Sequence, residues 1–524
     1  MFLKEIILYA YGYLVFFYSM ALIASYVMLI WLAYLEQRKS RHAMSDSYVR
    51  QIFRHSPYTP GVSIVAPAYN EEKTIVNNVK SLLRQDYPKF EIVIVNDGSK
   101  DNTLQEMIDN FDLVETPYNY RMHVAAKPFK RLFTSTNPKY KRLRVVDKVN
   151  GGTKADAVNG GLNVVRYPYF INTDVDCILA KDAILKCIRP MVEMNNVIAV
   201  SGVMNMSNGS RVEDGEMIEY RIPWSPIPLF QTLEYLRSFM VGKMGWSAIN
   251  AMPNVSGGYG MFDTEVAIAA GGYSSDSLAE DMDMLIRMVG YCCDFNRKYR
   301  VVQIPDTCCW TEGPGNLKIL YRQRTRWGHG LIQTFGKYYR MLFKRKYRQL
   351  GLITLPYVLV FEFLAPIIES IGFFTSIYLA LTGGVNWGTA GIIFAVMYVF
   401  CVQLSFVVIY YDYTQTKMKK FSSYLRLVVA ALLEPFIYHP LIVYFSLRGY
   451  LRFIMKKSVA WGEMTRQGFA QKKKEPSAPP PEGPAPEGPP KGGIPKDKPG
   501  KPGGDAEEHK IDGGDSEKFR AAML

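Results

Sequence analysis

The sequence lacks the features that mark several common protein classes. Its seven cysteines include no CxxC pair, and an odd number without metal-ligand spacing argues against a disulfide framework or a structural zinc site. It contains no Gly-rich dinucleotide fingerprint and no Walker loop, which argues against a Rossmann oxidoreductase and an ATPase. We therefore expect reduced thiols in a cytosolic domain, and the chemistry has to come from other residues.

Charge is absent over long stretches of a chain that is only 48% apolar overall. Residues 6–35 carry no charged side chain, and a membrane span needs about 20 apolar residues. This length predicts a transmembrane helix rather than a removable signal peptide. The basic cluster that begins at Arg38 predicts a cytoplasmic location for the domain that follows.

Three more apolar segments follow the central part of the chain, at 351–382, 388–411 and 427–447. Glu362 and Glu369 interrupt the first of them, and such carboxylates either face the interior of a helix bundle or lie solvated near the interface. In the last segment, Pro435 and Pro440 favour a short re-entrant hairpin over a single crossing. Eight Lys or Arg residues between Arg448 and Lys474 also argue for a cytosolic end.

The net charge of +14 could indicate nucleic acid binding. Much of the basic charge lies beside apolar runs, however, as in KYYRMLFKRKYR at 337–348. This placement favours contact with a membrane surface and predicts that the protein does not bind nucleic acid. From Lys472 onward the chain is rich in Pro, Gly, Lys and Glu and cannot bury enough surface to fold. Such a tail is either an inert linker, which we favour, or a site for accessory export or regulatory proteins.

Polar residues follow two predicted strands of the central region. VSIVAPAYNEE (62–72) and FEIVIVNDGSKDNT (90–103) each place a buried strand before a polar cluster and the start of a helix. Strand, helix and strand of these lengths form a βαβ unit and imply a parallel sheet. Ligands bind such sheets at the carboxyl ends of the strands, so both clusters are candidate site residues.

A third predicted strand, YPYFINTDVDCIL (167–179), ends in Asp174 and Asp176. Carboxylates at this spacing can both approach Mg²⁺ or Mn²⁺, which prefer oxygen ligands and commonly bridge to phosphates. Alone the pattern is weak, but after two similar strand ends it becomes much stronger. Lys154, in VNGGTKADAVNGG (149–161), offers a positive charge for a phosphate, or else it is a solvated residue at a helix start.

An acidic segment, SLAEDMDMLIRM (277–288), carries Glu280, Asp281 and Asp283. At the start of a helix, one of these carboxylates can project into a pocket, where burial raises its pKa toward that of a useful base. The alternative is an acidic first helical turn that the helix dipole favours.

Seven motifs, in order over roughly residues 60–460, resemble an inverting family 2 glycosyltransferase of the GT-A fold. The resemblance is to the membrane-embedded cellulose, hyaluronan and poly-N-acetylglucosamine synthases, and it rests on APAYNEE, NDGS, GGTKADAVNGG, TDVD, VSGGYGMF, AEDMD and QRTRW. It implies an α/β fold in which a GT-A nucleotide-sugar-binding domain, with a mixed and mostly parallel sheet, is inserted between transmembrane helices. The expected parts are an N-terminal transmembrane helix (1–40), a cytosolic GT-A domain (41–336), a basic interfacial helix (337–350), a C-terminal transmembrane bundle (351–457) and a Pro/Gly-rich cytosolic tail (458–524).

The resemblance also implies roles for individual residues. Asp281 would be the catalytic base, with Glu280 beside it, and Asp176 would ligand Mg²⁺ or Mn²⁺. The UDP-sugar would be bound by Ala66, Tyr69, Glu71, Asp97, Lys154, Asp174 and Arg326. The acceptor would be bound by Ser256, Gly257, Gly258, Gln323 and Trp327. The resemblance leaves Arg324 and His329 without a role.

The implied function is inverting, processive transfer of a sugar from UDP-glucose or UDP-N-acetylglucosamine to a growing β-linked polysaccharide. The chain would be exported through the protein's own transmembrane bundle in the inner or plasma membrane, in contact with membrane lipid. The alternative is a lipid glycosyltransferase that adds a single sugar to a membrane acceptor without translocation; Trp327 in the QxxRW motif favours the processive enzyme. An inactive scaffold would lack one of Asp174, Asp176 and Asp281, and all three are present.

Overall fold

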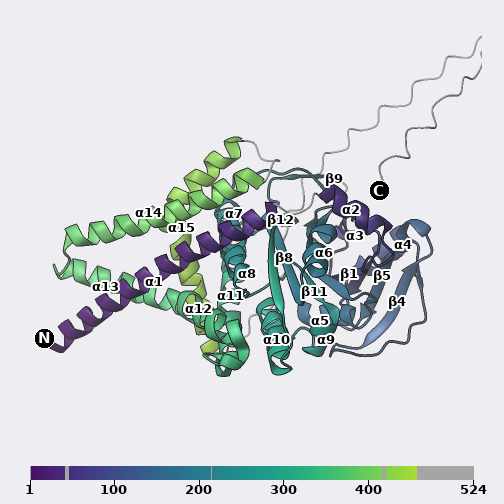
Figure 1. The fold of residues 1–524 in the computed structure, drawn as a ribbon, viewed down its shortest axis with the longest axis horizontal. Coiled ribbons are helices and arrows are strands. Elements are labelled where there is room, and N and C mark those ends of the chain that lie inside the picture. Colours follow the sequence, from purple (N-terminus) through teal and green to yellow (C-terminus); the bar gives the residue numbers. More distant parts are fainter. Residues whose placement is uncertain (1, 42–45, 214, 416–420, 457–524) are drawn as a thin grey trace, which may run out of the picture. The chain divides into compact units, whose positions relative to one another are not determined.

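The computed structural model describes residues 2–41, 46–213, 215–415 and 421–456 (Figure 1). All of them belong to one compact unit, Met1–Gln471. The tail expected at 458–524 lies outside the described residues.

A ten-stranded mixed sheet organises the expected GT-A domain (41–336), which we call the catalytic part (Figure 1). Its strand order is β3-β4-β5-β2-β1-β6-β11-β8-β12-β7. Seven strands (β3, β5, β2, β1, β6, β8 and β12) run in one direction, and β4, β11 and β7 run in the other. This confirms the mixed, mostly parallel sheet of a GT-A domain. The strands are β1 (Val62–Ala68), β2 (Phe90–Asn96), β3 (Leu113–Glu115), β4 (Phe129–Ser135), β5 (Leu143–Lys148), β6 (Tyr169–Thr173), β7 (Ile178–Leu179), β8 (Val197–Met206), β11 (Tyr259–Asp263) and β12 (Arg300–Thr311).

The predicted βαβ unit is confirmed. β1 and β2 pair in parallel, with Ala66 opposite Ile94, and α3 (Ile75–Leu83) connects them. Both strands are apolar runs buried almost throughout, as expected for central strands that are covered on both faces. β6 continues the parallel set beside β1, so the carboxyl ends of β1, β2 and β6 lie at the same edge of the sheet.

Helices and a small second sheet surround this core. The second sheet pairs β9 (Arg211–Glu213) with β10 (Glu216–Glu219). The helices are α2 (Asp46–His55), α3, α4 (Thr103–Phe111), η1 (Pro138–Tyr140), α5 (Lys154–Leu162), α6 (Ala183–Glu193), α7 (Pro226–Arg237), the π-helix η2 (Ser238–Lys243), α8 (Met244–Ala248), α9 (Thr264–Ala269), α10 (Glu280–Asp294) and α11 (Leu317–Tyr338).

Within the described residues, four helical segments are long and apolar enough to cross a membrane, one before the catalytic part and three after it, as the sequence predicts. They are Tyr11–Lys39, Leu350–Leu381, Trp387–Thr414 and Phe421–Ile454. The elements that contain them are α1 (Phe2–Arg41), η5 (Leu350–Thr354), α12 (Leu355–Val358), η6 (Leu359–Phe363), α13 (Ala365–Leu381), α14 (Trp387–Gln415) and α15 (Phe421–Ile454).

The hairpin expected between Pro435 and Pro440 is wrong, because α15 continues through both prolines. Each proline removes one backbone hydrogen bond from the helix, but transmembrane helices tolerate this loss when neighbouring helices support them. Here Glu434 pairs with Arg237 of α7, and Tyr438 bonds to residues of α7 and α11. These contacts fix α15 on both sides of Pro435.

The interfacial helix expected at 337–350 is also wrong as a continuous helix. α11 ends at Tyr338, and two short 3₁₀ turns follow, η3 (Tyr339–Met341) and η4 (Arg345–Tyr347). Phe343 and Arg348 have left-handed backbones, with φ of 58° and 49°, which a continuing α-helix cannot contain. The Phe343 N–H donates to the Gly351 carbonyl at 2.9 Å and folds the segment back on itself.

Glycines allow two of the membrane-spanning helices to pack closely on the catalytic part. A Cβ on Gly449 of α15 would lie 2.5 Å from the Thr325 carbonyl oxygen of α11, and one on Gly328 of α11 would lie 2.7 Å from the Ser446 carbonyl oxygen. A Cβ on Gly245 of α8 would lie 2.8 Å from a backbone oxygen of α1. The helix that carries the QxxRW motif is therefore in backbone contact with a membrane-spanning helix.

Candidate active site

Hydrogen bonds join the loops that follow β1 and β2. The Glu71 N–H donates to Thr103 Oγ1 at 2.8 Å, and the Asn70 N–H donates to Ser99 Oγ at 3.1 Å. Tyr69 is exposed and Glu71 is half-buried at this edge of the sheet. Ala66 differs, because it is fully buried inside β1 and its side chain is not available to a ligand.

Asp97 directly follows β2 and belongs to a buried ion cluster. The ammonium of Lys148 donates to Asp97 Oδ1 at 2.6 Å and also pairs with Asp156 of α5. The Gly151 N–H donates to the same Asp97 oxygen at 3.1 Å. Lys148 and Asp156 carry no local sequence signal for this role, and Lys148, held by Asp156, orients the Asp97 carboxylate at the end of the strand.

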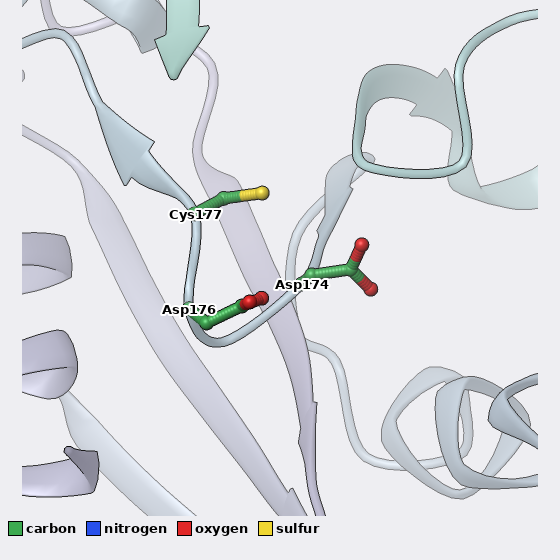
Figure 2. A group of neighbouring side chains, drawn as sticks. All are labelled: Asp174, Asp176 and Cys177. Carbon is green, nitrogen blue, oxygen red and sulfur yellow. The ribbon is translucent and has the colours of Figure 1, made fainter. Parts of the chain in front are cut away.

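Asp174 and Asp176 lie on the turn that follows β6, together with Cys177 (Figure 2). One potential ligand atom from each of the three lies within 4.8 Å of the others. Two carboxylates at this separation suit Mg²⁺ or Mn²⁺, so the residues fit the expected cation. Cys177 belongs to the same group, but its thiol is a soft donor, so the two carboxylates are the candidate ligands for this cation.

Lys154 begins α5, and because its side chain is only 8% exposed it is not the solvated residue of the alternative interpretation. Its ammonium pairs with Asp174 and donates to the Gly257 carbonyl at 2.6 Å. Burial alone would lower the pKa of Lys154, but the carboxylates of Asp174 and Glu280 raise it above its ordinary value. A positive charge therefore lies beside Asp174.

Glu280 and Asp281 begin α10, which confirms the predicted helix start. Glu280 is buried and Asp281 is half-buried. The Asn254 amide donates to Asp281 Oδ2 at 3.1 Å, and the Met282 N–H donates to Oδ1 at 2.8 Å. Burial raises the pKa of the Glu280 carboxyl, and the charge of Asp281 raises it further, while Lys154 and Arg326 oppose the shift.

The glycine loop before β11 brings these groups together. A Cβ on Gly257 would lie 3.5 Å from Glu280 Oε1 and 3.6 Å from Asp281 Cβ. A Cβ on Gly258 would lie 3.6 Å from Asp174 Oδ2. The carboxylates at the end of β6 and at the start of α10 therefore lie on either side of one loop, whose Ser256 is half-buried.

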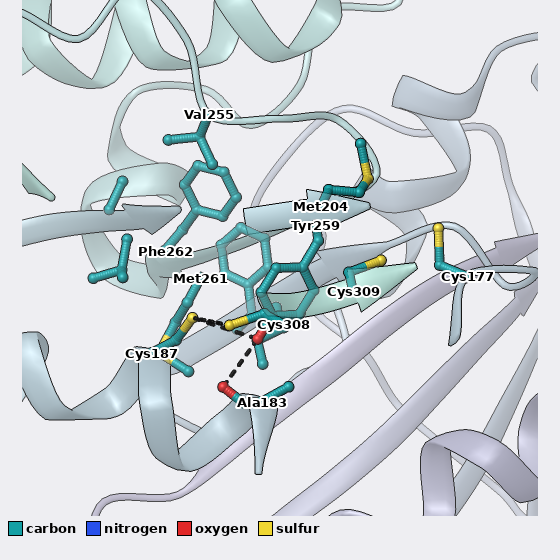
Figure 3. Packing of buried hydrophobic residues seen from close by; sticks show 14 of the residues in the cluster. Cys177, Ala183, Cys187, Met204, Val255, Tyr259, Met261, Phe262, Cys308 and Cys309 are labelled. Atoms are coloured by element: carbon teal, nitrogen blue, oxygen red, sulfur yellow. Dashed lines mark hydrogen bonds between the residues drawn. The ribbon is translucent and has the colours of Figure 1, made fainter. Parts of the chain in front are cut away.

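A buried tyrosine anchors this loop (Figure 3). Tyr259 directly follows the glycines and is fully buried, and its hydroxyl donates to the Ala183 carbonyl of α6 at 3.0 Å. Cys187 and Cys308 lie beside it with their sulfurs 3.9 Å apart. All seven cysteines are free thiols, as predicted.

The QxxRW residues lie on consecutive turns of α11. Gln323 Oε1 accepts a hydrogen bond from the buried Gln231 of α7 at 2.9 Å. Arg326 is half-buried and its charge acts on Glu280. Trp327 is 37% exposed, so part of its ring is accessible. The structure therefore brings Arg326 to the acidic start of α10.

Gly330 of α11 allows this approach, and we predict that replacing it disturbs the site. A Cβ at Gly330 would lie 2.9 Å from both the Cβ and the N atom of Ala279, directly before Glu280. Gly330→Ala should therefore cost about 1–3 kcal/mol through overpacking and displace Asp281. We expect a lower melting temperature in detergent and a lower rate of sugar transfer.

Gly336→Ala is the matched control on the same helix, because nothing lies within 4 Å of its added Cβ. Alanine in an exposed helix position should stabilise the protein by about 0.5–1 kcal/mol and leave transfer unchanged. Equal behaviour of the two variants would contradict the contact between Gly330 and the start of α10.

Comparison with known proteins gives relatives for this geometry. The chain is 26% identical over 307 residues to the poly-beta-1,6-N-acetyl-D-glucosamine synthase of Staphylococcus epidermidis, covering 59% of this chain and 62% of that protein. It is 25% identical over 273 residues to the enzyme of the same name from Staphylococcus aureus (strain COL), covering 52% and 54%. The chain thus spans between 54% and 62% of the length of these relatives.

Among solved structures, a mannosyltransferase from Pyrobaculum calidifontis in complex with GDP-Man and Mn²⁺ matches with a TM-score of 0.44 and 17% identity, over 82% of this chain and 100% of that one. Two family models match adjoining parts of the sequence. Glycosyl transferase family 2 matches residues 63–245, and Glycosyl transferase family group 2 matches residues 229–410. Together they match residues 63–410, which include the sheet, the site and much of the membrane-spanning region, and this part of the chain carries domains of glycosyl transferase family 2 and family group 2.

Proposed function

We propose that the protein transfers a hexosyl unit from a UDP-sugar, either UDP-N-acetylglucosamine or UDP-glucose, to the growing end of a β-linked polysaccharide. The observation that carries this proposal is the pair of acidic groups on either side of the glycine loop: Asp174 at the end of β6 and Asp281 at the start of α10. Asp174 would lie beside the nucleotide diphosphate, and Asp281 would act on the acceptor. The names of the relatives support N-acetylglucosamine as the sugar.

In the proposed reaction the Asp281 carboxylate accepts the proton of an acceptor hydroxyl as its oxygen attacks the anomeric carbon. The new glycosidic bond forms as the bond from that carbon to the diphosphate oxygen breaks, and UDP leaves. Attack from the face opposite UDP inverts an α-linked donor to a β-linkage. Asn254 and the Met282 N–H orient the carboxylate through their hydrogen bonds.

The leaving diphosphate needs positive charge. Lys154, which pairs with Asp174, and Arg326, whose charge acts on Glu280, supply it from this chain. Mg²⁺ or Mn²⁺ held by Asp176 and Asp174 would add Lewis-acid stabilisation of the departing diphosphate. Tyr69, Glu71 and the Asp97 cluster, which lie at the same edge of the sheet, would hold the uridine.

We propose that the catalytic part faces the cytosol and that Trp327 forms a platform for the acceptor sugar. The basic residues at the end of α1, from Arg38 to Arg41, support this orientation through the positive-inside rule. Backbone contact between α11 and α15 places the QxxRW helix beside a membrane-spanning helix, which suits a product that passes directly into the bundle.

The full chain in lipid vesicles, supplied with radiolabelled UDP-N-acetylglucosamine or UDP-glucose and Mg²⁺ or Mn²⁺, tests this proposal. We expect a long polymer that linkage-specific β-glycan hydrolases degrade. Product confined to a singly glycosylated lipid would contradict processive synthesis, and no transfer from either donor would contradict the proposed activity.

A further inference from the structure

Arg324 lies within the QxxRW motif but has no part in the proposed reaction. It is 4% exposed, and its guanidinium forms a two-point ion pair with Glu234 of α7, with one contact of 2.6 Å between Nη1 and Oε1. Its Nη2 also donates to the Tyr438 hydroxyl of α15 at 3.0 Å, and that hydroxyl donates to Glu234 Oε2 at 2.9 Å. Three helices thus converge on one guanidinium.

The face of the same guanidinium lies over the indole of Trp327. The distance from Arg324 Cζ to the ring centroid is 4.3 Å, within cation–π range. Glu234 and Tyr438 therefore bond to the nitrogens of the guanidinium while Trp327 packs on its carbon. This arrangement holds one face of the indole, while Trp327 as a whole remains 37% exposed.

We infer that Arg324 is a positioning residue, which holds Trp327 in the orientation that receives the acceptor sugar and is itself held by Glu234 and Tyr438. This inference rests on the proposed function of Trp327. We call the four residues involved the Arg324 cluster: Glu234, Arg324, Trp327 and Tyr438.

Lysine could not replace arginine in this cluster. A planar guanidinium can form a two-point pair with a carboxylate and stack on a ring at once, whereas an ammonium is a point charge. The charge balance supports the same conclusion. Burial alone would raise the pKa of Glu234, but the charge and hydrogen bonds of Arg324 outweigh it and lower this pKa. The pair is therefore ionised and directional.

A second buried ion pair provides a matched comparison. Arg237, three residues after Glu234 on α7, pairs with Glu434 of α15, four residues before Tyr438. Its Nη1 also donates to Ser405 of α14 at 3.3 Å. This pair joins the same two helices, α7 and α15, but has no described contact with Trp327. It separates a general role in helix packing from a specific role in holding the indole.

A double-mutant cycle on the full chain in vesicles tests the inference. Arg324→Lys should lower the transfer rate at saturating donor about tenfold. This is the effect expected when the buried guanidinium loses its stacking on Trp327 and its two-point ion pair with Glu234. In a Trp327→Phe background the same change should cost less than about twofold, because the indole it positions is gone. Arg237→Lys should lower the melting temperature similarly but have the same effect on transfer in both backgrounds.

An activity-independent measurement accompanies the cycle. The fluorescence of Trp327, taken as the difference between each chain and its Trp327→Phe counterpart, should be quenched more strongly by acrylamide in Arg324→Lys than in the parent or in Arg237→Lys. Equal losses of transfer in both backgrounds, or unchanged quenching of Trp327, would overturn the inference. Should the parent chain transfer no sugar, the proposed function fails, and the quenching comparison still decides whether Arg324 holds the indole.

Discussion

Asp281→Asn should lower the rate of sugar transfer by about a hundredfold to ten-thousandfold, the usual contribution of a positioned general base. The amide keeps the size of the side chain and can keep a hydrogen bond from Asn254, but it cannot accept the acceptor's proton. UDP affinity measured calorimetrically with Mn²⁺ should be unchanged. More than a tenth of the parent rate in this variant would contradict the assignment of the base.

Asp283→Asn is the control for this variant, two residues further along α10. Asp283 is buried, and its carboxylate bonds to Arg287, Lys337 and the Tyr338 hydroxyl. This variant should lower the melting temperature, because three donors lose a charged acceptor. Transfer per folded molecule should fall far less than in Asp281→Asn, and an equal fall would mean that the acidic start of α10 acts only through stability.

Asp176→Asn should have the second largest effect, a fall of about a hundredfold to a thousandfold in transfer, in the range for one lost stabilising contact to developing charge. The chain should also bind Mn²⁺ more weakly in an electron paramagnetic resonance titration, because a carboxylate ligand is replaced by a neutral amide. Excess Mn²⁺ should restore part of the activity if affinity is the defect.

Asp182→Asn is the control for the metal variant. Asp182 lies close by in sequence, but it pairs with Lys186 at 2.9 Å and does not belong to the Asp174, Asp176 and Cys177 group. Its Mn²⁺ affinity and transfer rate should match those of the parent. Loss of Mn²⁺ binding in both variants, or in neither, would contradict the proposed cation site.

Local sequence patterns predicted the central part of the fold. Strands such as Val62–Ala68 and Phe90–Asn96 are continuous apolar runs stopped by polar residues, and α10 begins at its acidic segment. Because the carboxyl ends of parallel strands meet at one edge, these local features sufficed to gather Glu71, Asp97 and Asp174 in one region. The four long apolar segments were equally readable from composition.

Interactions between distant parts of the chain could not be predicted from the sequence. The prolines of α15 argued for a break, and contacts with α7 and α11 hold the helix together instead. A run of basic and aromatic residues indicated a helix at 337–350, but left-handed Phe343 and Arg348 interrupt it. Arg324 pairs with Glu234, a residue 90 positions earlier, so no local pattern could connect them.

The structure also explains why glycines stand on either side of His329. Gly328 allows close packing on α15, and Gly330 allows close packing on the start of α10. His329 between them packs edge-on against the Phe453 ring, 5.3 Å between centroids. The segment after Trp327 is therefore a junction between the active-site carboxylates and the membrane-spanning helices, and its small residues are required by backbone proximity.

The anomeric configuration of the product tests the central claim most directly. The full chain in vesicles, supplied with UDP-N-acetylglucosamine isotopically labelled at the anomeric carbon, should yield polymer whose new linkages are all β by nuclear magnetic resonance. The Asp281→Asn chain under the same conditions should yield almost none. An α-linked product from the parent chain, or β-linked polymer formed at the parent rate by Asp281→Asn, would contradict inverting transfer with Asp281 as the base.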